Sequence, residues 1–456
     1  MAQPLIIICA VGLTPEHIGS ETPALNSLAG AGFTTPLVPA LPAVTTTAQT
    51  TMLTGVLASV HGIVGNGWYF RDLGEVLLWR QSEGLVDHPC VWTKLRQSGR
   101  ELHVMKHFWW YAMNSDCDSL ITPRPAYHAD GAKSPDFYTH PASLHDKLIK
   151  KHGPFPLFNF WGPTANIVST RWIAESFITA WRQRRPDLAL CYLPHLDYDL
   201  QRYGPTGSHL AANLRDLDAC IAPILAHAKE KNARVLVVSE YGIEAVDHGV
   251  MLNRTLREQG LLQVTTNATG ELLDPGTSAA FAVCDHQIAH VYCHDEASTA
   301  RAAAVITGMR GVERVYRGDE RAEIGLDHPR SGELVVLAEA GSWFVYDYWL
   351  EAAKRPDFAN NVEIHKKPGY DPRELFFDPA GGKRRAAVAL LRKKLGFRYR
   401  MNPVPLDPSL VKGSHGRLPS RPECGPLLIA DSTPAISPET WHQADIATLI
   451  QAHFAS

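Results

Sequence analysis

Short apolar runs alternate along the chain with longer segments in which apolar residues recur every three or four positions. Three runs rich in Val, Ile and Leu, at residues 6–11, 188–193 and 235–239, are typical of strands buried in a parallel sheet. Residues 169–182 and 210–231 have the spacing of amphipathic helices. The alternation predicts an α/β fold with a mostly parallel central sheet and helices on both faces. Ligands of such sheets bind beyond the carboxyl ends of the strands.

A different pattern occupies the second half of the chain. Residues 278–347 have a compact α+β pattern, and strand signals of the first kind resume only at residues 426–430. We therefore expect an inserted, smaller α+β cap region at residues 251–404. The core domain would then comprise residues 1–250 and 405–456.

Composition narrows the possible partners and the compartment. The chain has 44 Lys and Arg against 47 Asp and Glu, a net charge of −3, which gives no electrostatic case for a nucleic acid polymer or an anionic membrane as the main partner. No apolar stretch reaches the length of a membrane span. The eight cysteines are scattered without paired spacing, which favours reduced thiols and a cytoplasmic location.

One segment departs from this even balance of charge. Residues 382–400 contain eight basic residues and no acidic residue. The simpler interpretation is a solvated surface helix with a basic face, and the alternative is contact with a phosphate-rich ligand.

Hydroxyl side chains gather in one short segment before a predicted helix. Residues 42–55 read PAVTTTAQTTMLTG, and residues 61–67 read HGIVGNG. A helix that begins at Thr45 or Thr46 offers a hydroxyl and free backbone N–H groups together, which suits an anion. Simple N-capping by these threonines is the alternative.

These stretches, together with TPALNSL at residues 22–28, resemble the type I phosphodiesterase/nucleotide pyrophosphatase branch of the alkaline phosphatase superfamily. The resemblance implies an alkaline-phosphatase-like core with an inserted cap. It also implies that Thr45 is the nucleophile on a phosphoryl or phosphonyl group and that Asn66 binds a non-bridging oxygen. The backbone N–H of Thr46 would be a second oxyanion donor.

The family uses two metal ions roughly 4 Å apart to activate the threonine. Carried over to this chain, the candidate ligands are Asp197, Gln201, Glu240 and His415, and the expected cofactor is zinc or manganese, as one or two ions.

Several ligand positions depart from the family pattern. Val11 stands where the family has Asp and Tyr241 where it has His, and neither is a normal ligand for zinc. Gln201 replaces a second His, and Glu240 replaces an Asp.

Aromatic residues and other histidines are further candidates. Trp109, Trp110 and Tyr111 are candidate substrate contacts, since aromatic rings can stack on a base, but they could equally fill the core. Other histidines could in principle replace the lost ligands, although none stands at a strand end in the family's pattern: His248, His286, His290, His328 and His365.

Two functions are consistent with these residues. The first is a metal-dependent hydrolase that cleaves a phosphodiester, pyrophosphate or phosphonate bond in a small substrate, with Thr45 as nucleophile. The alternative, suggested by Val11 and Tyr241, is a catalytically impaired pseudoenzyme that keeps the fold and binds a ligand or partner.

Overall fold

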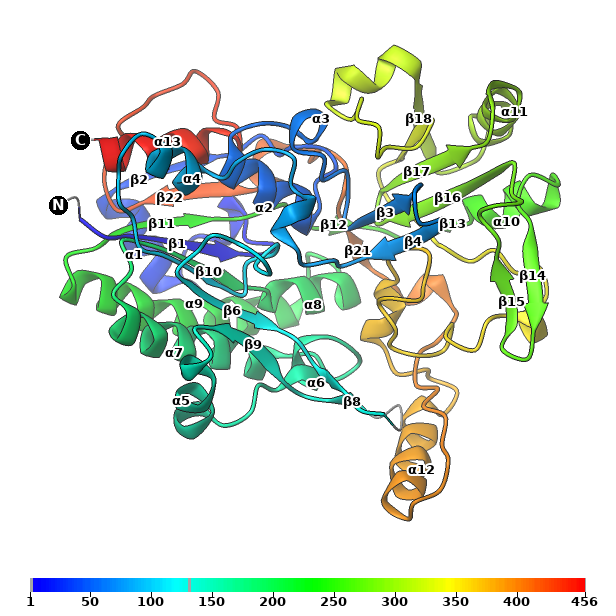
Figure 1. The fold of residues 1–456 in the computed structure, drawn as a ribbon, viewed down its shortest axis with the longest axis horizontal. Helices are drawn as coiled ribbons and strands as arrows, with labels where there is room; N and C mark the ends of the chain where they lie inside the picture. Colours follow the sequence, from blue (N-terminus) through cyan, green and yellow to red (C-terminus); the bar gives the residue numbers. More distant parts are fainter. Residues whose placement is uncertain (1–2, 130–132, 456) are drawn as a thin grey trace.

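The computed structural model describes residues 3–129 and 133–455, and its centre is one eight-stranded sheet (Figure 1). Across the sheet the strands are β2 (Phe33–Pro36), β22 (Leu427–Ala430), β11 (Arg234–Val238), β1 (Leu5–Ala10), β10 (Leu188–Leu193), β5 (Val104–His107), β6 (Ser119–Pro123) and β9 (Phe137–His140). The five strands from β11 to β6 are parallel, and β22 and β9 run antiparallel to their neighbours. The predicted mostly parallel sheet is therefore confirmed.

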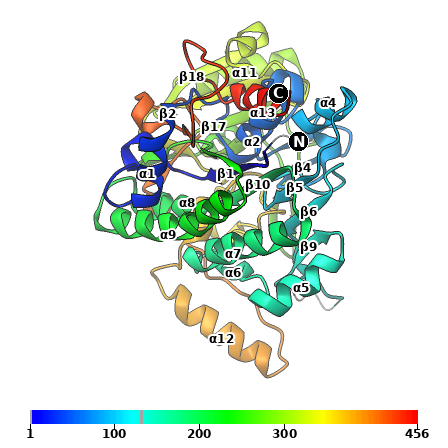
Figure 2. The same ribbon diagram turned by 90° about the vertical axis from the view of Figure 1, so that its left-hand side faces the viewer.

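The central strands are apolar on both sides because helices cover both faces. Every residue of β1 and β10 is buried, and Ile8 pairs with Cys191 on one side and Val237 on the other. Figures 1 and 2 show the two helical layers. One contains α1 (Pro23–Ala31), α7 (Ile167–Arg184), α8 (His195–Tyr203) and α9 (Ser208–Glu230), and the other contains α2 (Thr45–Thr54), α4 (Val91–Gln97) and α13 (Asp445–Ala455).

A second hydrophobic core lies beside the large sheet. Its four-stranded antiparallel sheet comprises β16 (Ala280–Asp285), β17 (Ile288–Cys293), β19 (Leu334–Ala338) and β18 (Val312–Arg317). The hairpin of β3 (Gly67–Phe70) and β4 (Glu75–Leu78) packs on this sheet, with the Tyr69 ring 5.1 Å from the Phe281 ring. This core therefore includes residues that precede residue 251 by more than a hundred positions. The boundaries of the cap region, residues 251–404, stay a prediction.

Smaller elements complete the described chain. The two-stranded pairs are β7 (Ala126–Tyr127) with β8 (Lys133–Ser134), β12 (Glu244–Ala245) with β21 (Gly413–Ser414), β13 (His248–Val250) with β20 (Ser342–Phe344), and β14 (Val264–Asn267) with β15 (Gly270–Leu273). The other α-helices are α3 (Ala58–His61), α5 (Ser143–His152), α6 (Leu157–Phe160), α10 (Leu252–Glu258), α11 (Glu296–Ile306) and α12 (Gly382–Lys394). The 3₁₀ turns are η1 (Pro15–His17), η2 (Glu83–Leu85), η3 (Gly318–Ile324), η4 (Ala352–Lys354), η5 (Pro372–Leu375), η6 (Pro408–Leu410) and η7 (Pro422–Cys424). Among the described residues, no helix combines the length and apolarity needed to cross a bilayer.

Candidate active site

Thr45 is the first residue of α2 and is almost completely buried. Its Oγ1 lies 3.2 Å from the hydroxyl oxygen of Tyr241, which follows β11. The Tyr241 hydroxyl donates to Oδ1 of Asp197 at 3.2 Å, so the Thr45 hydroxyl is left as the donor toward Tyr241. Asp197 lies in the first turn of α8, directly after β10. The carboxyl ends of two central strands therefore bring these residues to the start of α2, as expected for this kind of sheet.

The other candidate metal ligands are engaged within the protein. The Gln201 side-chain amide donates to Asp197 Oδ2 at 2.8 Å, and its oxygen accepts from the Tyr370 hydroxyl at 3.1 Å. His415 Nδ1 donates to the carbonyl oxygen of Ala43 at 2.7 Å, and its Nε2 lies 4.0 Å from Asp197 Oδ1. The oxygen of Gln201 thus faces Tyr370, away from the carboxylate beside which a shared metal would bind.

Glu240 is fully buried next to these groups. Its Oε1 accepts from Nε2 of Gln49 at 2.5 Å and from Sγ of Cys9 at 3.5 Å. Burial, with a contribution from the nearby Asp197 carboxylate, raises the pKa of Glu240 to about 8, although the bond from Gln49 lowers it. Burial also raises the pKa of Asp197 to about 7, against the lowering effect of the Tyr241 and Gln201 hydrogen bonds. In the described part of the chain neither carboxylate pairs with Lys or Arg, and the His415 ring beside Asp197 is neutral at pH 7.

Four aromatic rings form a continuous buried column beside Asp197. The rings of Tyr241 and His415 are stacked, with centroids 3.5 Å apart and planes 6° apart. His286 follows at 3.7 Å from His415, and Tyr370 at 3.7 Å from His286. Burial, the largest cause for both histidines, lowers their pKa values well below the usual range, so both rings are neutral at pH 7.

The two predicted oxyanion donors bind each other. The backbone N–H of Thr46 donates to Oδ1 of Asn66 at 3.1 Å. The backbone and side-chain N–H groups of Asn66 both donate to Asp285, at 2.8 and 3.1 Å, and Asp285 also accepts from Nδ1 of His286 at 2.7 Å. In this conformation the backbone N–H groups of Thr46 and Asn66 and one side-chain N–H of Asn66 are used within the protein.

The predicted aromatic contacts lie at different depths. Trp109 is buried in the core beneath the large sheet. Trp110 is partly exposed, and its ring packs at a tilt against that of Trp79, with centroids 4.9 Å apart. Its backbone N–H donates to Oε1 of Gln49. Tyr111 is buried. Their role in substrate binding stays a prediction.

The donor set does not fit the family's two-metal centre. Val11 is completely buried among apolar side chains, the Tyr241 ring is stacked on His415, and Gln201 presents an amide N–H group to Asp197. Across residues 3–129 and 133–455, no cluster of three or more His, Cys, Asp or Glu side chains is placed to hold a metal ion. We therefore derive no catalytic step through a pair of metals.

The sequence alone does not identify three residues of this site as functional. His286 was one of several competing histidines, and neither Asp285 nor Tyr370 was a candidate. All three come from the second half of the chain, between the core segments, and meet the core residues only in the folded protein. A polar CDHQ cluster at residues 284–287, just after an apolar run, was the only local signal.

Comparisons with known proteins agree with this architecture. The family model for type I phosphodiesterase/nucleotide pyrophosphatase matches residues 5–371. An uncharacterized pyrophosphatase/phosphodiesterase from Schizosaccharomyces pombe is 23% identical over 249 residues, which cover 52% of this chain. The matching part spans only 44% of that yeast protein.

Two solved structures share the fold. Phosphonoacetate hydrolase from Sinorhizobium meliloti, in complex with phosphonoformate, has a TM-score of 0.60 at 14% identity, covering 99% of this chain and 96% of its own. Murine ectonucleotide pyrophosphatase/phosphodiesterase 5, in an inactive form in complex with AMP, has a TM-score of 0.59 at 13% identity, covering 99% and 95%. With a family model that spans most of its length and the same core fold, this chain belongs to the type I phosphodiesterase/nucleotide pyrophosphatase family of the alkaline phosphatase superfamily.

Proposed function

We propose that this chain is a catalytically impaired member of its family, which keeps the fold to bind a small phosphate or phosphonate ester, or a protein partner, without two-metal hydrolysis. The observation that carries the proposal is the column of Tyr241, His415, His286 and Tyr370. Both carboxylate oxygens of Asp197 already accept hydrogen bonds, from Tyr241 and Gln201, and the Tyr241 ring is held by its stack on His415. Without a metal or a strong base, a threonine hydroxyl is a poor nucleophile at neutral pH.

The start of α2 remains a place where an anion can bind. Helix N-termini carry unpaired N–H groups and a partial positive charge, and α2 begins at Thr45 without a side-chain cap. Binding there requires Asn66 and Thr46 to exchange their mutual hydrogen bond for bonds to the ligand.

The hydrolase predicted from sequence is the second candidate, and one observation favours it. Asp197 and Glu240 are buried near Thr45, and among the described residues no Lys or Arg pairs with either of them. One divalent cation would offset the cost of burying two carboxylates. A single zinc or manganese held by Asp197, Glu240 and Thr45, with His415 and Gln201 reorienting, would be the reduced form of the family centre.

Metal content and turnover, measured together, separate the two candidates. The purified protein would be analysed for bound metal and assayed with a nitrophenyl phosphodiester, with and without added zinc or manganese. We expect less than stoichiometric metal and no turnover above that of Thr45→Ala. Turnover that is lost in Thr45→Ala and in Glu240→Gln would overturn the impaired-enzyme proposal in favour of the one-metal hydrolase.

Ligand binding is tested in the same preparation. AMP and phosphonoacetate, which are bound by structural relatives, are titrated calorimetrically against the wild type and Asn66→Ala. We expect binding of at least one anion that weakens in Asn66→Ala. If neither anion binds, the remaining form of the proposal is a protein partner.

A further inference from the structure

Helix α12 and the segment that returns from it form an arm that stands away from the rest of the molecule (Figures 1 and 2). The base of the arm is fixed: the Arg385 guanidinium pairs with Asp378 and also donates to the carbonyl oxygen of Asn402 at 3.1 Å. Beyond the buried Ala389, every residue from 390 to 400 is exposed. We call residues 382–400 the basic arm.

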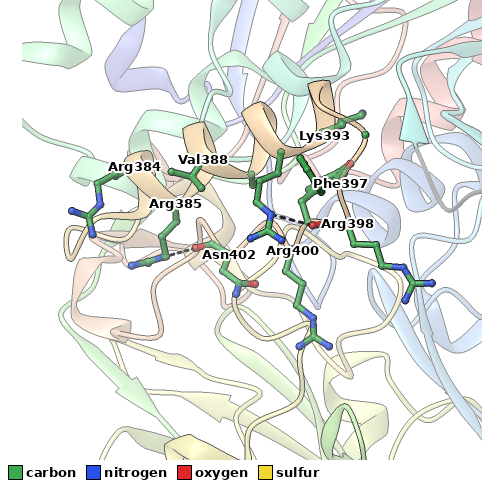
Figure 3. A pocket seen from close by; sticks show the side chains of 12 residues that line it. Arg384, Arg385, Val388, Lys393, Phe397, Arg398, Arg400 and Asn402 are labelled. Atoms are coloured by element: carbon green, nitrogen blue, oxygen red, sulfur yellow. Dashed lines mark hydrogen bonds between the residues drawn. The ribbon is translucent and has the colours of Figure 1, made fainter.

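Positive charge is concentrated on the basic arm without compensation. It carries no acidic residue, and within the described part of the chain only Arg385 of its basic residues forms an ion pair. Figure 3 shows the guanidinium groups of Arg384, Arg398 and Arg400 pointing outward, around an open groove of about 1280 Å³ between α12 and the returning chain. The basic residues are Lys383, Arg384, Arg385, Arg392, Lys393, Lys394, Arg398 and Arg400.

Large apolar side chains are interleaved with these charges. Leu390, Leu391, Leu395 and Phe397 are 56%, 57%, 62% and 61% exposed, and Val388 is 52% exposed. A solvated basic helix needs no such exposed apolar side chains. Exposed apolar groups are unfavourable in water, and where they gather they mark interaction sites.

We propose that the basic arm is a peripheral membrane anchor that docks on an anionic lipid surface. Lys and Arg would bind the lipid phosphates while the Leu and Phe side chains enter the boundary between headgroups and acyl chains, which is the combination typical of interfacial amphipathic segments. A nucleic acid would use the positive charge but not Leu390, Leu391 and Leu395, since aliphatic side chains offer its bases no stacking. The whole chain has a net charge of −3 although the arm is strongly basic, so the rest of the molecule is negative. An anionic surface would therefore attract the arm and repel the rest of the molecule.

Vesicle co-sedimentation of the full chain tests the proposal. We expect binding to phosphatidylcholine vesicles that contain phosphatidylserine, little binding to phosphatidylcholine alone, and weakening in high salt. Replacing Arg392, Lys393 and Lys394 by Gln is expected to lower partitioning about a hundredfold, since each basic side chain at an anionic surface contributes roughly a fivefold factor. Replacing Leu391, Leu395 and Phe397 by Ser is expected to lower it at least about tenfold.

Matched controls lie elsewhere on the surface. The triple change of Lys147, Lys150 and Lys151 to Gln removes the same charge from α5, and Leu73→Ser removes an apolar side chain that is 62% exposed. Both controls should bind vesicles like the wild type, and all variants should keep its unfolding temperature because the altered residues are exposed. The proposal is overturned if the wild type does not bind anionic vesicles, if the controls lose as much binding as the arm variants, or if the arm variants bind anionic vesicles like the wild type.

Discussion

Tyr241 follows β11, and its hydroxyl joins Thr45 to Asp197. Removing that hydroxyl in Tyr241→Phe leaves the buried carboxylate of Asp197 with one hydrogen bond fewer. We expect the free energy of unfolding, measured by urea denaturation, to fall by roughly 1–3 kcal/mol. The matched change Tyr127→Phe, on a side chain that is 64% exposed, should stay within about 0.5 kcal/mol of wild type. Equal effects of the two changes would contradict a structural role for the Tyr241 hydroxyl.

A buried histidine far from the candidate site predicts how stability depends on pH. His107 in β5 lies 2.9 Å by its Nε2 from the Ser176 hydroxyl, and burial lowers its pKa to about 3. In the unfolded chain His107 takes up a proton near pH 6.5, whereas in the folded chain it stays neutral until the pH nears 3. The stability that neutral His107 contributes is therefore fully present above pH 6.5 and is lost as the pH falls toward 3. Between pH 7.5 and 5.5, this one group should lower the free energy of unfolding by about 1.4 kcal/mol.

To isolate the contribution of His107, the free energy of unfolding of two variants is measured at pH 7.5 and at pH 5.5. His107→Gln should be less stable than wild type at pH 7.5 but should lose less stability on acidification. His294→Gln, which changes a side chain that is 75% exposed, should keep the wild-type pH dependence. An unchanged pH dependence in His107→Gln would show that the proton uptake is located elsewhere.

Strands and helices whose own residues carry a full apolar run or helical period could be predicted from the sequence. Strands β1 and β10 and helices α7 and α9 agree with the predicted segments within two residues, because each carries a full run or period of apolar residues. The antiparallel direction of β22 was not predictable, since direction depends on the chain between strands and not on the strand's own residues.

The short strand β21 is a feature whose importance only the structure reveals. A Cβ atom at Gly413 would lie 2.1 Å from the Leu200 carbonyl oxygen in α8, and Gly413 leads directly into His415. Gly413→Ala must therefore push α8 and β21 apart, and we expect it to lower the free energy of unfolding by about 1–3 kcal/mol.

The contrasting change is Gly30→Ala in α1, where a Cβ atom would meet nothing within 4 Å. Because alanine favours the helix over glycine, this variant should be as stable as wild type or up to about 1 kcal/mol more stable. Thermal unfolding of both variants checks the pair. A Gly413→Ala protein with wild-type stability would mean that the packing of α8 on β21 is loose.

At the scale of the whole molecule, the candidate site lies where the two hydrophobic cores meet. Asp285 at the end of β16 binds Asn66, and the backbone N–H of Gln287 donates to the carbonyl oxygen of His415 at 2.9 Å. Such contacts join residues more than a hundred positions apart, so no local spacing encodes them. The sequence could therefore identify Thr45 and Asp197 through the family motifs. It could not show that the Tyr241 hydroxyl joins them, or that the rings of His415, His286 and Tyr370 continue from the Tyr241 ring.

The segment that returns from the second core to the first is held by a fully buried ionic cluster. The Arg373 guanidinium binds Asp347 through both terminal nitrogens, at 2.9 and 2.6 Å, and Asp371 through Nε at 2.7 Å. Close by, the indole of Trp161, which follows α6, donates to Glu374 at 2.7 Å. Losing the guanidinium would leave Asp347 buried without its counter-ion, which costs far more than an exposed pair is worth.

Arg373→Met is therefore expected to lower the free energy of unfolding by about 3–5 kcal/mol, measured by urea denaturation at pH 7. The double variant Arg373→Met with Asp347→Leu should recover part of this loss, because it removes the stranded carboxylate together with its partner. Arg71→Met, which breaks the exposed pair of Arg71 with Glu333, is the matched control and should cost less than about 1 kcal/mol. If Arg373→Met costs no more than Arg71→Met, the buried cluster contributes no more to stability than an exposed ion pair.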